Sequence, residues 1–162
     1  MTGPRLRTDL VLAVVYRASP LRWLQMRRAR GPMAGTGPGS WHPVMGHVEE
    51  GETAADAVRR ELGEELGLAG GALAGLWQLD GVHPFFLATP DEVYLSSAFV
   101  ARAADGFKPS LNDEHDAWRW VDDADAGHRF VWPFQLAAVE EARRYVLRPT
   151  PAREMLRIDP HG

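Results

Sequence analysis

The first part of the chain consists of apolar runs of strand length separated by short polar breaks. Residues 9–16 (DLVLAVVY) form a nearly continuous apolar run rich in valine, which predicts a buried central strand. Ser19–Pro20 indicates a turn. Residues 21–26 then predict a second strand, paired with the first as a hairpin or through the sheet.

Strand patterns return further along the chain. Residues 69–75 are small and rich in glycine, and they predict a loop. Residues 76–86 are apolar but are interrupted by Gly81 and Pro84, which is compatible with a strand that has an irregular end. Residues 92–101 (EVYLSSAFVA) predict another strand.

A helix is predicted between these groups of strands. Thr53 followed three residues later by Asp56 is a variant of the capping box, because the hydroxyl is available to the free N–H groups of the first turn. Gly67 stands where a left-handed C-terminal cap is expected. The predicted helix starts at Thr53 and is about three turns long.

This helix carries glutamates on one face. Glu61, Glu64 and Glu65 are spaced i, i+3, i+4, and like charges at that spacing destabilise a bare helix. One interpretation is a solvated acidic face, partly compensated by Arg59 and Arg60. The other is a site for hard divalent cations, which take oxygen ligands and often bridge to substrate phosphates.

The loop before the helix favours the cation site. Loop and helix together fit the spacing G-x5-E-x7-R-E-U-x-E-E-x-G-U, where U is a bulky aliphatic residue. Its fixed positions are Gly46, Glu52, Arg60, Glu61, Leu62, Glu64, Glu65, Gly67 and Leu68. At every fixed position this segment resembles the Nudix box. We expect the resemblance to extend from near Asp9 to near Leu147.

The resemblance implies an α/β Nudix fold, in which a mixed β-sheet is sandwiched between helices. It also implies that the box helix binds Mg2+, with Mn2+ as a substitute, and that the metal bridges a diphosphate and helps to activate water. The implied ligands are Glu61, Glu64 and Glu65, completed by a backbone carbonyl at Met45 or Gly46. Many relatives have glycine at the place of Met45, whose side chain limits how tightly the loop can turn.

Glu52 and Arg60 are expected to have a structural role within the site. Their pairing would hold the loop against the helix and orient the carboxylates. The alternative for Arg60 is a surface pair with Glu64, four residues along the helix, which contributes little to stability.

Candidate substrate-binding residues lie between the second strand and the box. Arg27, Arg28 and Arg30 are either solvated or in contact with phosphate, since planar guanidinium groups suit phosphate oxygens. Similar arginines end this strand in several Nudix subgroups, which favours Arg27 and Arg28. Residues 31–40 (GPMAGTGPGS) predict an irregular loop that either closes over substrate or is a disordered insertion. Trp41 either stacks on a base or pterin ring or anchors this loop in the core.

Residues 110–121 (SLNDEHDAWRWV) combine an acidic loop with a short strand. By the period of two, Trp118 and Trp120 face one side of that strand and Arg119 faces the other. In many Nudix enzymes a glutamate in this loop serves as an extra metal ligand or general base, and Glu114 is the match. The alternative is an exposed loop acid.

Both ends of the chain are expected to be peripheral to a single domain. Residues 1–8 are basic and contain a proline, which indicates a loose leader. Trp132–Pro133 begins the last predicted helix, whose apolar stripe continues to near Leu147. Residues 148–162 are rich in proline and have little to hold them. The length of 162 residues is typical of one domain.

Composition excludes several classes of protein. With 45% hydrophobic residues the chain can bury an ordinary soluble core. A formal net charge of −4 argues against non-specific binding to a nucleic acid polymer. The absence of cysteine excludes disulfides, thiolate metal sites and a cysteine nucleophile. No apolar run approaches a membrane span and no signal peptide is visible, so we expect a cytoplasmic protein without membrane contact.

The segments WHPVMGHVEEGE and EHDAWRWV, followed by a helix that starts with WP, look most like one Nudix subgroup. That subgroup contains dihydroneopterin triphosphate pyrophosphatase and dATP pyrophosphohydrolase. The resemblance implies Mg2+-dependent cleavage of a nucleoside triphosphate or pterin triphosphate to a monophosphate and pyrophosphate.

Other functions stay open. Proline in the neighbourhood of His83–Pro84 is associated with ADP-ribose hydrolases, and an ADP-ribose or dinucleoside polyphosphate hydrolase would share the box, since substrate choice lies outside it. A non-catalytic nucleotide-binding sensor is less favoured, because such proteins commonly lose box acids and this box is complete. Isopentenyl diphosphate isomerases share the fold but use a catalytic cysteine. Nudix proteins often form homodimers, and no residue here demands one.

Overall fold

The computed structural model describes residues 3–29, 31 and 37–162. Arg30 and much of the glycine-rich segment 31–40 lie outside the described residues. The strands are β1 (Arg5–Arg7), β2 (Leu10–Ala18), β3 (Leu21–Arg28), β4 (Trp41–His42), β5 (Val44–His47), β6 (Leu73–Leu87), β7 (Glu92–Ala103), β8 (His115–Val121) and β9 (Arg157–Ile158). The helices are α1 (Ala54–Leu66), α2 (Pro133–Tyr145) and α3 (Pro151–Leu156), with short 3-10 turns η1 (Gly70–Ala72) and η2 (Asp123–Asp125).

The described strands form one mixed sheet in the order β4-β3-β2-β7-β6-β9. β2 pairs with β3 in an antiparallel hairpin and with β7 in parallel, so it is the central strand that the sequence predicts. Off this main path, β5 also pairs with β2 and β8 pairs with β3. These two pairings bring the residues before α1 and the acidic loop before β8 to the same side of the molecule.

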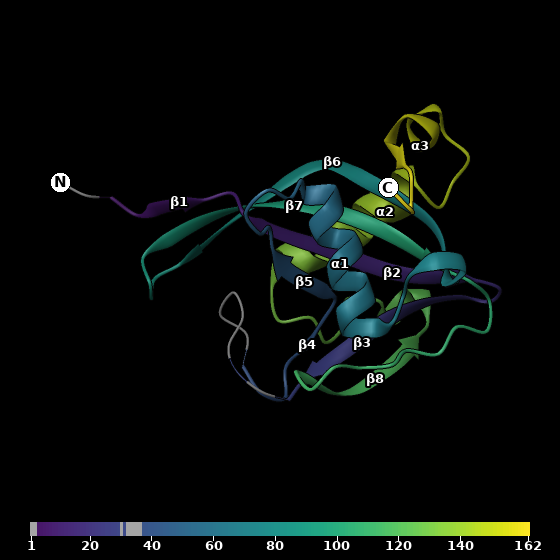
Figure 1. Cartoon of the computed structure of the whole chain (residues 1–162), viewed down its shortest axis with the longest axis horizontal. Coiled ribbons are helices and arrows are strands. Elements are labelled where there is room, and N and C mark those ends of the chain that lie inside the picture. Colours follow the sequence, from purple (N-terminus) through teal and green to yellow (C-terminus); the bar gives the residue numbers. More distant parts are fainter. Residues whose placement is uncertain (1–2, 30, 32–36) are drawn as a thin grey trace.

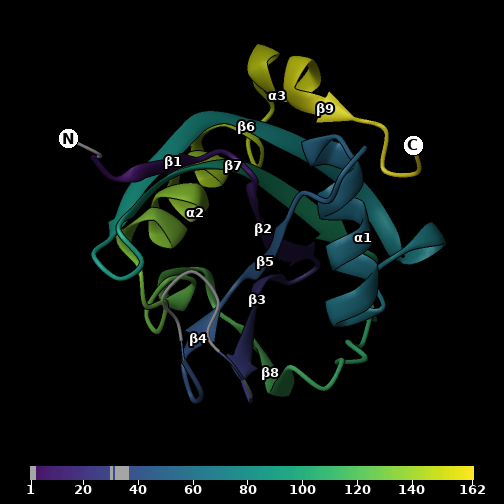
Figure 2. The same ribbon diagram turned by 60° about the vertical axis from the view of Figure 1, so that its left-hand side comes forward.

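Helices α1 and α2 cover opposite faces of the sheet (Figure 1 and Figure 2). Alternate residues of β2 explain this arrangement, because successive side chains of a strand point to opposite faces. Val11 packs in the layer that holds Leu62 of α1, whereas Leu12 packs in the layer that holds Val139 of α2. A strand buried on both faces needs a continuous apolar run, which is what the sequence shows.

Helix α1 has the ends that the sequence predicts. The Thr53 hydroxyl accepts a hydrogen bond from the backbone N–H of Asp56, and the Asp56 carboxylate accepts one from the backbone N–H of Thr53. At the other end Gly67 has the left-handed conformation, with φ 69°. These caps set where α1 begins and ends, and so set the rotation of its acidic face.

The region around β6 is partly as expected. The register of β6 against β7 shifts between Gln78 and Val82, near Gly81, but the ladder then continues without a shift to Leu87, so the irregularity lies inside the strand and not at its end. The prediction of a loop over residues 69–75 is wrong at its end, because β6 already begins at Leu73. Leu73 is buried in the layer beneath α1, so its packing extends the strand into a glycine-rich segment.

The expectation that both ends are loosely held needs correction. β1 pairs in parallel with the start of β7, and the Arg5 and Arg7 guanidinium groups contact Glu92. After α3, strand β9 pairs with β6 through Ile158 opposite Leu76. Free backbone groups along β6 and β7 supply these partners, and such edges are visible only once the sheet has formed.

Among the described residues, no helix is long and apolar enough to cross a membrane.

Candidate active site

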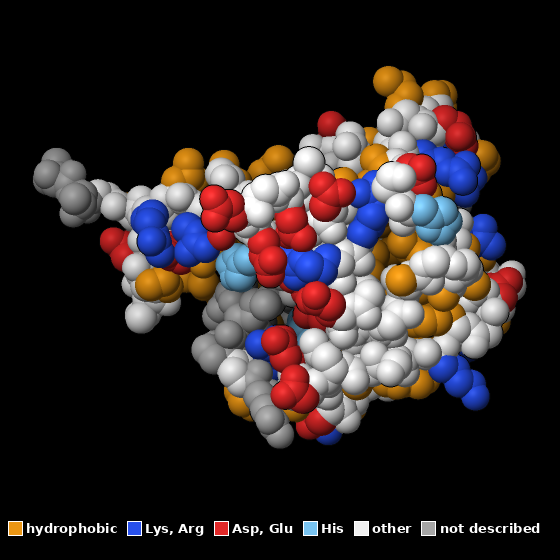
Figure 3. Space-filling model, in the orientation of Figure 1, with side chains coloured by type: hydrophobic (Ala, Val, Ile, Leu, Met, Phe, Trp, Pro, Cys, Tyr) orange, Lys and Arg blue, Asp and Glu red, His pale blue; other side chains and the backbone are white. Residues whose placement is uncertain are grey.

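The glutamates of α1 share one face but differ in exposure. The Glu64 side chain is 58% exposed, that of Glu61 is 12% exposed, and Glu65 as a whole is 1% exposed. Figure 3 shows acidic side chains gathered over α1. Exposure to solvent therefore decreases from Glu64 through Glu61 to Glu65. The spacing of the three residues alone does not reveal this difference.

Glu65 is an unusual buried acid. Burial raises the pKa of its carboxyl group well above the ordinary value, and the nearby charges of Glu61 and Glu114 raise it further. Arg28 and a hydrogen bond from the backbone of Met45 act in the opposite direction. The Oε2 atom of Glu65 has no hydrogen-bond partner. A buried carboxylate with an unused oxygen is a ready ligand for a cation.

Gly46 lies directly against the acidic face of α1. A Cβ atom added at this position would overlap the Glu61 carboxylate. The next residue back, Met45, directs its side chain to the other face of the sheet, where its sulfur accepts a hydrogen bond from Gln135 at 3.2 Å. Its bulk therefore lies away from the carboxylates, and the backbone at 45–46 can approach them closely.

Arg60 joins the loop to the helix, as predicted. Its Nε and Nη2 atoms donate to the two carboxylate oxygens of Glu52 at 2.8 and 3.0 Å, and Nη2 also donates to the His47 carbonyl at 2.9 Å. Its Nη1 donates to Glu61 at 2.8 Å and to Glu64 at 3.3 Å. The pair with Glu52 and the helical pair with Glu64 therefore exist together. Hydrogen bonds from Arg60 lower the pKa of Glu52.

Glu114 approaches this group from the loop before β8. Its Oε2 accepts a hydrogen bond from Arg28 Nη1 at 2.8 Å, and its backbone N–H donates to Asn112 at 3.2 Å. Glu114 is close enough to raise the pKa values of both Glu61 and Glu65. The loop acid thus lies within electrostatic range of the helix acids, and its role as a metal ligand or general base stays a prediction.

The two arginines at the end of β3 have different environments. Arg27 lies at the surface, where its Nε donates to Asp116 at 2.6 Å, and its guanidinium lies 5.9 Å from the centre of the Trp41 ring. Arg28 is 5% exposed. Its Nε and Nη1 already donate to the Gly31 carbonyl and to Glu114, so these two donors are engaged within the chain, and phosphate contact by Arg28 stays a prediction.

A positively charged side chain that the sequence did not single out lies against the Trp41 ring. The Arg119 guanidinium lies 4.2 Å from the Trp41 ring centre, and its Nε donates to Gln25 at 2.9 Å. Trp41 itself is half-buried. Alternation along β8 predicts that the side chains of Arg119 and Trp118 point to opposite faces of the sheet. Arg119 meets Trp41 only because β4 and β8 both pair with β3, on either side of it. Cation–π contact of this kind holds the ring in place.

Two buried histidines beside the site were also missed. The rings of His42 and His115 lie 5.0 Å apart between centres, and burial lowers the pKa of each to about 4. Nδ1 of His42 lies 2.7 Å from the Pro43 carbonyl, and Nδ1 of His115 lies 2.9 Å from Asn112 Oδ1. The Nε2 atoms have no partner. Both rings are therefore neutral at pH 7.

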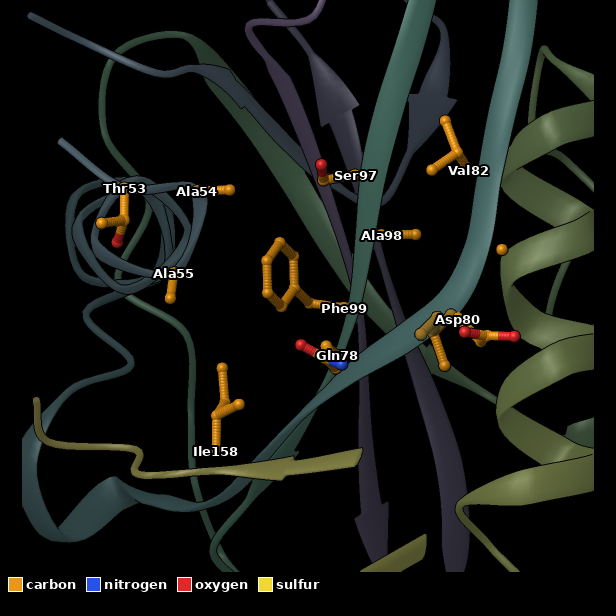
Figure 4. A pocket seen from close by; sticks show the side chains of 12 residues that line it. Thr53, Ala54, Ala55, Gln78, Asp80, Val82, Ser97, Ala98, Phe99 and Ile158 are labelled. Atoms are coloured by element: carbon orange, nitrogen blue, oxygen red, sulfur yellow. The ribbon is translucent and has the colours of Figure 1, made fainter. Parts of the chain in front are cut away.

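A separate hollow of about 360 Å3 lies between the start of α1 and strands β6 and β7 (Figure 4). Its lining includes Thr53, Gln78 and Phe99, and none of the acidic residues discussed above. The carboxylates of α1 thus lie outside this hollow.

The site suits a hard divalent cation. Its donors are carboxylate and backbone oxygens, Glu65 keeps a buried oxygen free, and position 46 leaves no room for a side chain. In the described part of the chain, no three His, Asp or Glu side chains already form a coordination shell. Instead Arg60 holds Glu61 and Glu64, and Arg28 holds Glu114.

A family model described as NUDIX domain matches residues 6–146. This chain belongs to the Nudix family. The match covers every acidic and basic residue of the site described above, and members of this family typically depend on a divalent metal.

Curated relatives are longer than the matched part of this chain. The chain is 36% identical over 134 residues to an octanoyltransferase of Myxococcus xanthus, which covers 82% of this chain and 34% of that protein. It is 31% identical over 111 residues to an RNA pyrophosphohydrolase of Caulobacter vibrioides, which covers 60% of this chain and 62% of that protein. The chain therefore spans less than two thirds of either relative.

Solved structures share the fold. A Caenorhabditis elegans Ap4A hydrolase superposes with a TM-score of 0.69 at 20% identity, covering 87% of this chain and 98% of that one. The dihydroneopterin triphosphate pyrophosphohydrolase of Escherichia coli superposes with a TM-score of 0.66 at 25% identity, covering 86% and 96%. These likenesses confirm the α/β Nudix fold, with a mixed sheet and flanking helices.

Proposed function

We propose that this chain is a divalent-metal-dependent pyrophosphohydrolase that cleaves a diphosphate linkage in a nucleotide-like small molecule. The observation that carries the proposal is the close approach of Gly46 to the Glu61 carboxylate, on the same helix face where Glu65 keeps a buried oxygen without a hydrogen-bond partner. Bringing like charges together destabilises the protein, and a bound cation is the simplest compensation. Membership of the Nudix family supports the same activity.

Glu61, Glu64 and Glu65 hold Mg2+ in this proposal, with the Gly46 carbonyl as a backbone ligand. Mn2+, which takes the same oxygen ligands, substitutes for it. When bound, the metal neutralises charge on the diphosphate and lowers the pKa of water. Glu52 and Arg60 orient the helix carboxylates, because Arg60 bonds to Glu52 and Glu61 together.

Glu114 acts as the general base or as an additional ligand. Its side chain is 43% exposed, so water reaches it, and it lies within the electrostatic range of Glu61 and Glu65. As a base it accepts the proton of a water molecule whose oxygen forms a bond to phosphorus. The bridging P–O bond breaks, and the leaving phosphate group takes its electron pair.

The substrate class follows from the ring and phosphate contacts available. We infer a nucleoside or pterin triphosphate, cleaved to a monophosphate and pyrophosphate. The likeness to the E. coli dihydroneopterin triphosphate enzyme supports this choice. Arg27 is accessible to a phosphate, and Trp41 with Arg119 stacked on it offers a planar surface to a heterocyclic ring.

A second candidate is hydrolysis of the 5′-triphosphate end of RNA. The sequence argues against a nucleic acid polymer, but the Caulobacter relative is an RNA pyrophosphohydrolase. Dinucleoside polyphosphates and ADP-ribose are further members of the same chemical class. All of these share the diphosphate that the proposed site cleaves.

The test is product analysis with a panel of substrates in Mg2+. The panel contains dihydroneopterin triphosphate, the deoxynucleoside triphosphates, diadenosine tetraphosphate, ADP-ribose and a short 5′-triphosphate RNA. We expect release of pyrophosphate from a small triphosphate, loss of turnover with a chelator, and recovery on adding metal. Turnover of no panel member, or turnover that survives Glu64→Gln unchanged, contradicts the proposal.

We further propose that the chain acts as one domain. β1 and β9, from opposite ends, join the same sheet. Light scattering after size-exclusion chromatography decides between a monomer and a homodimer.

A further inference from the structure

Arg28 is the last residue of β3 and, among the arginines that the structure describes near the site, the most enclosed. It is 5% exposed, and its Nη1 donates to Glu114 Oε2 at 2.8 Å while its Nε donates to the Gly31 carbonyl at 3.1 Å. The backbone N–H of Arg28 donates to the Ser40 carbonyl, and its carbonyl accepts from Gly39. Arg28 is therefore held in place by its backbone as well as by its side chain.

Glu114 is held at two points, by the last residue of β3 and by the residue that follows it. Its carboxylate accepts from Arg28, and its carbonyl accepts from the backbone N–H of Ala29 at 2.7 Å. The second bond belongs to the backbone and fixes where the loop lies. The bond from Arg28 fixes where the carboxylate points, since the Glu114 side chain is otherwise free to turn toward solvent.

The charge of Arg28 also acts on the helix acids. Arg60 compensates Glu61 and Glu64 from the outer side of α1. Arg28 acts from the end of β3, where its charge opposes the effect of the Glu114 charge on the pKa of Glu65. The charge of Arg28 is therefore needed because the Glu114 carboxylate is present, and without that carboxylate this need ends.

We propose that Arg28 is a positioning residue that holds the Glu114 carboxylate beside Glu65, and not a ligand of the substrate. The catalytic consequence of this inference rests on the proposed function. It predicts that Arg28 acts only through Glu114, so that its contribution vanishes when the Glu114 carboxylate is absent.

The test is a double-mutant cycle with Arg28→Gln, Glu114→Gln and the double variant, read out as kcat and KM on the best panel substrate. Replacing a residue that orients a ligand typically lowers activity about 10- to 100-fold. We expect that loss in kcat for Arg28→Gln, KM changed by less than about threefold, and no further loss in kcat when Arg28→Gln is added to Glu114→Gln. Arg28→Lys should recover part of the loss, because an ammonium group can still reach Glu114.

The control is Arg22→Gln. Arg22 lies on the same strand and pairs with Asp122, far along the strand from the acids. It should leave kcat and KM unchanged. Urea unfolding of every variant shows whether each is folded, and if Arg28→Gln does not fold, Arg28→Lys with and without Glu114→Gln replaces it in the cycle.

A second readout uses Mn2+ alone, measured by electron paramagnetic resonance without substrate. Arg28→Gln should weaken Mn2+ binding, and it should have no further effect in the Glu114→Gln background.

If the wild-type chain turns over no substrate but binds Mn2+, the proposed activity fails and this cycle still decides the role of Arg28. Equal losses in both backgrounds, by either readout, overturn the inference, as does an Arg28→Gln effect confined to KM. Failure of the wild-type chain to bind Mn2+ overturns it together with the proposed function.

Discussion

Gly46 and the Glu61 carboxylate approach each other so closely that no Cβ atom fits between them. The loop before α1 and the middle of the helix are therefore in direct contact at the point where the acidic residues gather. Position 46 requires glycine because the Glu61 carboxylate leaves no room for a side chain. Backbone conformation is not the reason, since Gly46 is not among the residues with positive φ.

Replacing Gly46 by alanine should displace Glu61 and lower kcat by about 10- to 100-fold, the range found when the support of a ligand is lost. Steady-state kinetics with Mg2+ measures the loss. Gly63→Ala is the matched control, because Gly63 lies inside α1 with open space around its Cβ position. That change should keep activity and stabilise the protein by up to about 1 kcal/mol, since alanine favours helix.

Glu65→Gln should abolish turnover while making the metal-free protein more stable. The pKa of Glu65 is raised by burial and by Glu61 and Glu114, so the folded state binds its proton more tightly than the unfolded state does. Stability is therefore lost as the pH rises from the ordinary carboxyl pKa through the raised one. Urea unfolding at pH 5 and pH 8 should show the larger stabilisation by Glu65→Gln at pH 8. A variant that is less stable than wild type at pH 8 would contradict this account.

Arg60→Lys should weaken the site although it keeps the charge. Arg60 bonds to both oxygens of Glu52, and lysine cannot reproduce that planar two-point contact. We expect a loss of about 10-fold or more in activity or in Mn2+ affinity. Arg59→Lys is the control, since Arg59 bonds instead to Asp56 and to the Asp159 carbonyl. Equal effects of the two substitutions would refute the special role of Arg60.

Acid should destabilise the protein through His42 and His115. The pKa of each is lowered to about 4, so below pH 6.5 the unfolded chain takes up protons that the folded one does not. Stability should fall between pH 6.5 and pH 4, by up to about 3 kcal/mol for each ring. Urea unfolding across this range measures the slope. His42→Phe, which keeps a ring but removes one titrating group, should flatten it, and an unchanged slope would exclude His42 as its source.

Much of the candidate site could be predicted because its pattern is local. The spacing of Glu61, Glu64 and Glu65, with caps at Thr53 and Gly67, lies within one short segment, and helical geometry alone puts these carboxylates on one face. The pairing of Glu52 with Arg60 follows from the same segment. The prediction that Glu114 joins these acids depended on the family resemblance. A loop 49 positions beyond Glu65 carries no local signal of where it lies in the fold.

The sequence by itself determined the box helix, the central strand β2, the existence of the strand β3 and the identity of the helix acids Glu61, Glu64 and Glu65. These follow from periodicity, capping and spacing, which act over a few residues. Only the tertiary structure decided that Arg28 is enclosed while Arg27 is exposed, that Arg119 covers Trp41, and that β1 and β9 close the sheet edges. Neighbouring strand residues always point to opposite faces, but which face is covered depends on the segments packed against it, and those come from distant parts of the chain.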